Sequence, residues 1–129
     1  MVVTKGVHHV GLTVSDLEAS ARFFTELLGW QEVRRTDYPA IFVSDGVVML
    51  TLWSAQVLPS REFDKDANIG LHHIALLVDT ISELNALYKK LSDAGVEFEF
   101  SPELLREGPA RHMMCYEPSG IRVEFICPG

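Results

Sequence analysis

The segment Gly6-Val7-His8-His9-Val10-Gly11-Leu12-Thr13-Val14 recurs without gaps as Gly70-Leu71-His72-His73-Ile74-Ala75-Leu76-Leu77-Val78. The copies start 64 residues apart, and every aligned pair except Thr13 with Leu77 is identical or similar. A repeat at a fixed offset indicates that one supersecondary unit is used twice in the chain. Both copies are apolar and rich in strand-forming residues, so each predicts a β-strand that opens a module.

A helix is predicted after each copy. Ser15-Asp16 and Asp79-Thr80 are signals for a helix N-terminus, and Gly29 and Gly95 suit a left-handed C-terminal cap. Between these signals, apolar residues recur at spacings of three to four. They are Leu17, Ala21, Phe24 and Leu28 in the first copy and Ile81, Leu84, Leu87, Tyr88 and Leu91 in the second.

Three β-rich runs follow each helix: residues 31–35, 40–44 and 47–53, and then 97–100, 111–116 and 121–126. Each copy therefore reads strand, helix, strand, strand, strand. We predict an α+β fold of two tandem βαβββ modules that form a curved mixed sheet or an open barrel-like cleft. Residues 1–129 would be a single domain, with module one at 6–58, a polar connector at 59–69 and module two at 70–127, because one module alone buries too little apolar surface.

Composition excludes several classes of partner. The formal net charge of -7 disfavours nucleic acid and an anionic membrane surface, because phosphates repel an acidic protein. The first apolar stretch is too short and too polar for a signal peptide or a membrane span. Cys115 and Cys127 are the only cysteines and are interpreted as reduced thiols. The sequence thus predicts a cytoplasmic protein.

The duplicated histidine pairs and one late glutamate are the candidate site. Alternation along a strand would place the two histidines of each pair on opposite faces, so one of each would face the space between the modules. Glu124 lies within an apolar strand and needs a cation. That cation is either Arg122 on the same face or a divalent metal that is also bound by two imidazoles, the 2-His-1-carboxylate arrangement. For the histidines, the alternative is ordinary packing.

Several segments resemble the vicinal-oxygen-chelate superfamily, which contains glyoxalase I, bleomycin-resistance proteins, fosfomycin transferases and extradiol dioxygenases. The resembling segments are 9–17, Phe23-Phe24, 27–29, 73–79 and 117–124, so the resemblance covers nearly the whole chain. It implies paired βαβββ modules, a metal in the cleft between them and commonly a homodimer. It also implies that the metal ligands are His9, His73 and Glu124.

One position departs from the glyoxalase I pattern. That enzyme takes a fourth ligand, Glu or Gln, from the last strand of module one, where this chain has Leu50 or, with a shift of one residue, Thr51. Leucine cannot bind a metal and threonine rarely does. The resulting set of three ligands resembles more closely that of the extradiol dioxygenases and fosfomycin transferases.

Further candidates lie on the strand before the final turn. Alternation places His112 and Tyr116 on one face, and the resemblance turns that face toward the cavity. His112 would then be a general acid or base and Tyr116 a hydrogen-bond donor. Simple packing of His112 is the alternative. Arg106 and Arg111 are either binding groups for an anionic substrate or surface residues.

The favoured function is an enzyme that uses a divalent ion (Fe, Mn, Ni, Co or Zn) to act on a small oxygen-chelating substrate. A lyase, isomerase or transferase and an extradiol-type dioxygenase are both retained. The shortness of the chain favours the former group, and the three-ligand set favours a dioxygenase or a transferase. The competing functions are a metal-free drug-binding protein of the bleomycin-resistance type and a purely structural dimeric domain.

Overall fold

The computed structural model describes residues 1–129 and divides into two compact units, Met1–Arg61 and Glu62–Gly129. The boundary falls inside the predicted connector. No helix in the chain has the length and apolar character needed to cross a membrane.

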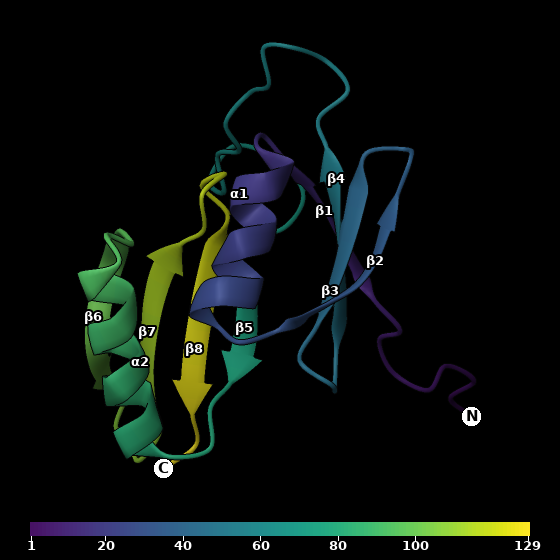
Figure 1. The fold of residues 1–129 in the computed structure, drawn as a ribbon. Coiled ribbons are helices and arrows are strands. Elements are labelled where there is room, and N and C mark those ends of the chain that lie inside the picture. The colour runs from purple at the N-terminus through teal and green to yellow at the C-terminus, as the bar shows by residue number, and fades with distance from the viewer. The chain divides into compact units, whose positions relative to one another are not determined.

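The first unit is a four-stranded mixed sheet with one helical segment. Its elements are β1 (Val10–Val14), α1 (Leu17–Arg22), η1 (Phe23–Leu27), β2 (Gln31–Thr36), β3 (Ala40–Ser44) and β4 (Met49–Ser54). The strand order is β1-β4-β3-β2, with β1 parallel to β4 and the other pairs antiparallel (Figure 1).

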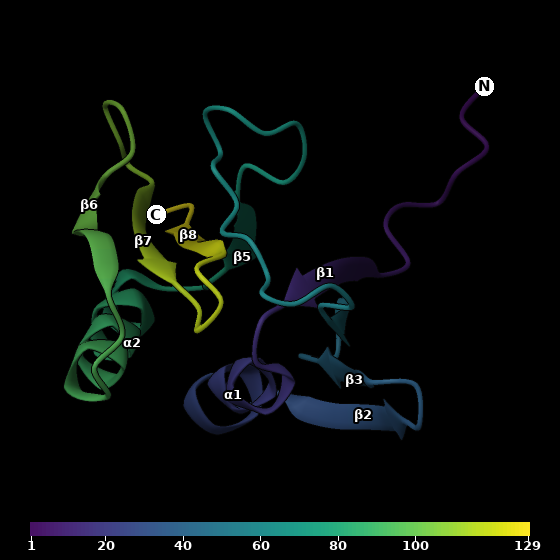
Figure 2. The same cartoon turned by 90° about the horizontal axis from the view of Figure 1, so that it is seen from above.

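The second unit repeats this topology. Its elements are β5 (Ile74–Leu77), α2 (Ile81–Asp93), β6 (Phe98–Leu104), β7 (Arg111–Tyr116) and β8 (Arg122–Cys127). The strand order is β5-β8-β7-β6, with β5 parallel to β8, and β6 is an edge strand (Figure 2). The prediction of two tandem βαβββ modules in an α+β fold is therefore confirmed, and the sheets remain open.

The helix ends follow the local signals in the sequence. The Asp16 carboxylate accepts a hydrogen bond from the Ala19 amide at 3.0 Å, and the Thr80 hydroxyl accepts one from the Glu83 amide at 3.1 Å. Gly95 ends α2 with a φ of +85°, which is a conformation that a residue with a side chain rarely adopts. The side chains of Asp16 and Thr80 thus satisfy backbone amides that the first turn of each helix leaves unpaired.

The core of each unit lies between its helix and one face of its sheet. Leu84 and Leu91 of α2 are fully buried, as is Val123 of β8, and Phe125 is nearly so. Because side chains alternate along a strand, Arg122 and Glu124 point to the opposite face of β8. The face of the sheet that α2 leaves uncovered is thus the one that carries the candidate site.

Two local features differ from the prediction. The helix predicted to be continuous changes at Phe23 into a π-helical turn, and this wider turn accompanies burial of both Phe23 and Phe24, whose rings lie 5.2 Å apart. In addition, β1 and β5 begin later than the repeated segments suggest. The first residue of β1 with a ladder partner is Val10, so His9 precedes the strand.

Candidate metal and catalytic site

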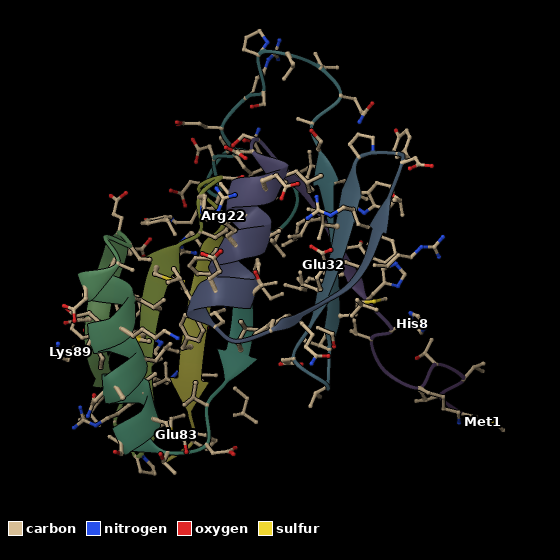
Figure 3. All side chains as sticks on the ribbon, viewed as in Figure 1. Met1, His8, Arg22, Glu32, Glu83 and Lys89 are labelled. Carbon is tan, nitrogen blue, oxygen red and sulfur yellow. The ribbon has the colours of Figure 1, made fainter.

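The histidine pairs lie in the segments that lead into β1 and β5, and Figure 3 shows His8 in the first of them. The expectation that the two histidines of a pair occupy opposite faces of a strand is wrong, because these residues precede the strands. Instead their rings meet edge to face, with the Nδ1 atoms of His8 and His9 separated by 2.9 Å and those of His72 and His73 by 2.8 Å. The same geometry in both modules shows that the repeat extends to side chains.

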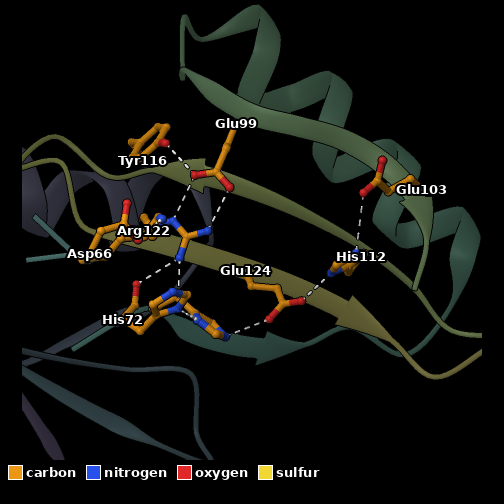
Figure 4. A network of polar contacts seen from close by, with 10 residues as sticks. Asp66, His72, Glu99, Glu103, His112, Tyr116, Arg122 and Glu124 are labelled. Carbon is orange, nitrogen blue, oxygen red and sulfur yellow. Dashed lines mark hydrogen bonds and ion pairs between the residues drawn. The ribbon is translucent and has the colours of Figure 1, made fainter. Parts of the chain in front are cut away.

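Glu124 is the centre of the candidate site in the second unit. It is buried, with 8% of its surface exposed. Its Oε1 lies 3.2 Å from His73 Nε2, and its Oε2 lies 2.5 Å from His112 Nδ1 (Figure 4). The structure therefore brings together three of the residues predicted from the sequence, with the two imidazoles on different oxygens of one carboxylate. His9 belongs to the first unit.

His112 reaches Glu124 from the neighbouring strand β7. Its ring packs 4.7 Å from that of Phe100, and its side chain is 14% exposed. The other ring nitrogen, Nε2, lies 3.8 Å from Glu103 Oε1 on β6. His112 therefore lies between two carboxylates, but only its Nδ1 is within hydrogen-bond distance of one, the carboxylate of Glu124.

Arg122, the alternative partner of Glu124, is engaged by Glu99 of β6. Its Nε and Nη2 atoms donate to the two Glu99 oxygens at 3.0 and 2.8 Å, and the Tyr116 hydroxyl donates to Oε1 of the same carboxylate at 2.7 Å. These bonds, above all those from Arg122, lower the pKa of Glu99 from its ordinary 4.5 to about 2. The bond to Glu99 also raises the pKa of Tyr116, which favours a protonated phenol that donates.

This ion pair predicts an acid-dependent stability difference between wild type and Glu99→Gln. Since the pKa of Glu99 is lower in the folded state than in the unfolded chain, its contribution is complete above about pH 4.5 and disappears as the pH falls through about 2. The side chain is 30% exposed, so solvent screening reduces the effect to about 1–2 kcal/mol. Urea unfolding of both proteins across this pH range measures it.

Glu97→Gln is the matched control, because Glu97 is exposed and immediately precedes the strand that carries Glu99. Its unfolding free energy should follow that of wild type at every pH. If Glu99→Gln were equally destabilised at pH 7 and below pH 2, the stabilisation would come from packing, and the ion-pair explanation would be wrong.

The register of the strands identifies the module-one counterpart of Glu124. Glu124 lies opposite Ala75, and the repeat aligns Ala75 with Gly11, which lies opposite Thr51. The counterpart is therefore Thr51, and the alignment that placed Leu50 there is wrong. Thr51 is buried, and its Oγ1 accepts a hydrogen bond from Trp53 Nε1 at 2.9 Å. No carboxylate or amide stands at this position.

The donor chemistry of His73 and Glu124 fits a divalent metal ion. An imidazole nitrogen and a carboxylate oxygen about 3 Å apart have the separation of neighbouring ligands that each lie about 2.1 Å from one ion. Within either unit, no group of three His, Cys, Asp or Glu side chains converges on such a point.

Both thiols are buried and unpaired with each other, and burial raises the pKa of Cys115 to about 12.

The two-module α+β fold defines a class of protein, and the sequence matches the same class. A sequence model of the Glyoxalase/Bleomycin resistance protein/Dioxygenase superfamily matches residues 6–125. The chain belongs to this superfamily, and the resemblance inferred from the sequence is confirmed.

Relatives within the superfamily carry different activities in their names. A catechol-2,3-dioxygenase of Bacillus subtilis is 33% identical over 91% of this chain, which spans 40% of that enzyme. A probable lactoylglutathione lyase of Synechocystis is 28% identical over 92% of both chains. The crystal structure of a glyoxylase/bleomycin resistance protein/dioxygenase domain from Frankia superposes with a TM-score of 0.83, at 28% identity over 98% of this chain and 94% of that one.

Sequence reasoning did not identify Glu99 and Glu103 as part of the polar network. Both lie on β6, where irregular pairing with β7 interrupts the simple alternation of faces. Glu99 did carry a signal, because it is a charged residue between Phe98 and Phe100 in a predicted strand. The sequence pattern offers Arg122 only as a partner for Glu124, because the two lie on the same face of one predicted strand.

Proposed function

We propose that this protein is a divalent-metal-dependent enzyme acting on a small substrate that binds the metal through two neighbouring oxygens, with His9, His73 and Glu124 as the protein ligands. One observation carries the proposal: Glu124 is buried beside two imidazoles while Arg122, the arginine that would neutralise it, is bound to Glu99. A buried carboxylate in this position requires a positive partner. Family membership supports the same conclusion.

When bound, the ion, which we take to be Fe, Mn, Ni, Co or Zn, supplies Lewis-acid polarisation of substrate oxygens. His73 and Glu124 would hold it from the second module. With Thr51 at the fourth position, the protein supplies three ligands and leaves the remaining positions to substrate and water. The three-ligand count supports dioxygenase or transferase chemistry, and the name of one relative, a probable lactoylglutathione lyase, supports lyase chemistry.

His112 is the proposed general acid or base. Its Nδ1 lies 2.5 Å from Glu124 Oε2, and its Nε2, which has no partner within hydrogen-bond distance, is the nitrogen left to exchange a proton with substrate or solvent. Tyr116 is proposed as a hydrogen-bond donor, since its phenol is held protonated beside Glu99. The homodimer and the cytoplasmic location remain predictions from the sequence.

Metal content tests the proposal. Elemental analysis of the purified wild type is expected to find about one Fe, Mn, Ni, Co or Zn per chain, and His9→Ala, His73→Ala and Glu124→Ala are each expected to lose it. Glu83→Ala is the matched control, because it removes the same side chain as Glu124→Ala from an exposed position on α2. It should retain its metal.

Absence of metal from wild type, even after incubation with each ion, would overturn the proposal in favour of a metal-free binding protein. Retention of metal in Glu124→Ala would also contradict it, since that ligand has no nearby substitute on β8. If wild type binds metal, two turnover assays separate the dioxygenase from the lyase. One uses a catechol under oxygen and the other uses lactoylglutathione, the compounds that the names of two relatives contain.

A further inference from the structure

Three aromatic side chains of the first unit meet on the face of its sheet that is turned away from the core. The ring of Trp53 on β4 lies 6.1 Å from that of Phe42 on β3 and 5.8 Å from that of Tyr38, which precedes β3. Trp53 and Phe42 are half-buried, and Tyr38 is 59% exposed. Their strand neighbours Leu52 and Val43 are fully buried, so alternation directs Trp53 and Phe42 to the opposite face.

The indole of Trp53 is held in one orientation. Its Nε1 donates a hydrogen bond to Oγ1 of the buried Thr51 at 2.9 Å. The indole also lies against Gly11 of β1, where a Cβ atom would come 3.3 Å from Thr51 Oγ1 and 3.6 Å from Trp53 Nε1. Gly11 does not have a positive φ, so its missing side chain leaves room for the indole and serves no special backbone angle. A ring fixed in this way loses little conformational entropy when a ligand packs on it.

The second module has no rings at the matching positions. The strand register makes Ile126 the counterpart of Trp53 and Met114 the counterpart of Phe42. A requirement of the shared βαβββ fold would act on both modules, whereas these aromatic side chains occur in one. Their presence therefore indicates a role that belongs to the first module alone.

An arginine stands beside the rings. Arg34 lies directly opposite Phe42 in the antiparallel pair of β2 and β3, so the two side chains share a face and their Cβ atoms are about 5 Å apart. The next residue, Arg35, points to the other face and is bound by Glu18 and Glu32. Arg34 is exposed and has no ion pair with an acidic side chain. It is therefore available to an anion that approaches the rings.

We propose that Trp53, Phe42 and Tyr38 bind the aromatic ring of an anionic substrate and that Arg34 binds its carboxylate. Aromatic rings attract one another in offset or edge-to-face contact, and a guanidinium binds a carboxylate through two parallel hydrogen bonds. An aliphatic acid would satisfy only the arginine, and a neutral aromatic compound would satisfy only the rings. The site therefore selects molecules that combine both groups.

This site lies next to the first module's proposed metal ligand. Gly11, which contacts the indole, follows His9 by two residues, about 7 Å along an extended chain. The inference deepens the proposed function, on which its word substrate rests, by naming the chemical class. Binding of the ring and the carboxylate itself requires no metal, so it can be measured separately.

The experiment is a ¹H–¹⁵N NMR titration of the metal-free full chain with phenylacetate, which carries a ring and a carboxylate. The signal of the Trp53 indole N–H should shift and saturate. The other tryptophan, Trp30, is the internal control, because it is buried against Phe24 in the core, and its signal should not move. Cyclohexylacetate, which lacks the aromatic ring, and benzyl alcohol, which lacks the charge, should each bind about 2–10-fold more weakly.

Variants test the individual side chains, with binding followed at the Gly11 amide. Trp53→Leu should weaken phenylacetate binding about 10-fold, and Trp53→Phe, which keeps a ring, should recover part of the loss. Arg34→Met should weaken phenylacetate about 2–5-fold and leave benzyl alcohol unchanged. Arg22→Met is the matched control, because it removes the same charge from an exposed position on α1, and it should change neither affinity (Figure 3).

An unshifted Trp53 signal at about 10 mM phenylacetate, which would reveal a Kd of about 1 mM, would overturn the inference. Equal affinity for the three compounds would also overturn it, and so would phenylacetate binding that Arg34→Met leaves unchanged. If Trp53→Leu does not fold, Trp53→Phe and Arg34→Met decide. If phenylacetate binds as expected but wild type takes up no metal, the inference stands and the proposed function fails. If wild type binds metal and phenylacetate leaves Trp53 unaffected, only the inference fails.

Discussion

Replacing His112 by glutamine is expected to lower the turnover of the metal-loaded protein by about 10²–10⁴-fold, the usual contribution of a positioned acid or base. His112 is 14% exposed, and its Nδ1 lies 2.5 Å from Glu124 Oε2. A glutamine amide can still donate a hydrogen bond to that oxygen, but it cannot take up and release a proton near neutral pH. The rate should therefore fall while the metal content stays at the wild-type level.

Turnover and metal content must be measured on the same samples, with whichever substrate wild type converts. Tyr116→Phe is the comparison on the same strand, and it should cost less than His112→Gln, because its hydroxyl is engaged by Glu99 and does not contact Glu124. Loss of metal from His112→Gln would identify His112 as a ligand. Full activity with metal retained would remove it from the proposed proton transfer.

Replacing Phe24 by alanine is expected to cost about 3–5 kcal/mol of unfolding free energy, the range for removing a buried aromatic ring. Phe24 has no exposed surface, and its ring packs against those of Phe23 and Trp30 at centroid distances of 5.2 and 5.1 Å. The backbone also holds it rigidly, because its carbonyl accepts a hydrogen bond from the Trp30 amide across the helix end. The cavity left by the ring would therefore close poorly.

Equilibrium urea unfolding measures this cost. The expected loss is a large part of the total unfolding free energy of a small domain, which is about 5–15 kcal/mol. Val33→Ala is the control, since Val33 is 56% exposed on β2 and should change the free energy by no more than about 0.5 kcal/mol. A cost below about 1 kcal/mol for Phe24→Ala would contradict the prediction and show that this ring contributes little to the stability of the fold.

Much of the fold followed from short-range patterns. The recurrence of 6–14 at 70–78, the helical spacing of apolar residues and the capping residues Asp16 and Thr80 are all local, and each corresponds to an element of the structure. Such signals are readable because an amphipathic period and a cap depend on residues within a few positions of one another. The first residue of β1 could not be predicted in this way, because a strand begins where ladder pairing begins and not where the apolar residues begin.

The site residues of the second module could be selected by residue type, since a carboxylate in an apolar strand and duplicated histidines are unusual. Their partners could not. Glu99 binds Arg122 across 23 residues, His112 reaches Glu124 across 12, and Arg122 reaches His72 across 50. Each contact depends on which strands are neighbours and in which register.

The sequence by itself thus determined two βαβββ modules, the superfamily and the residues His73, His112 and Glu124 as candidates. Only the tertiary structure decided that Arg122 pairs with Glu99, that Thr51 is the counterpart of Glu124, and that Glu124 lies between His73 and His112. The physical reason is that a shift of one residue along a strand turns every side chain to the other face. Local patterns do not set that register, whereas the hydrogen-bonded ladder between distant segments does.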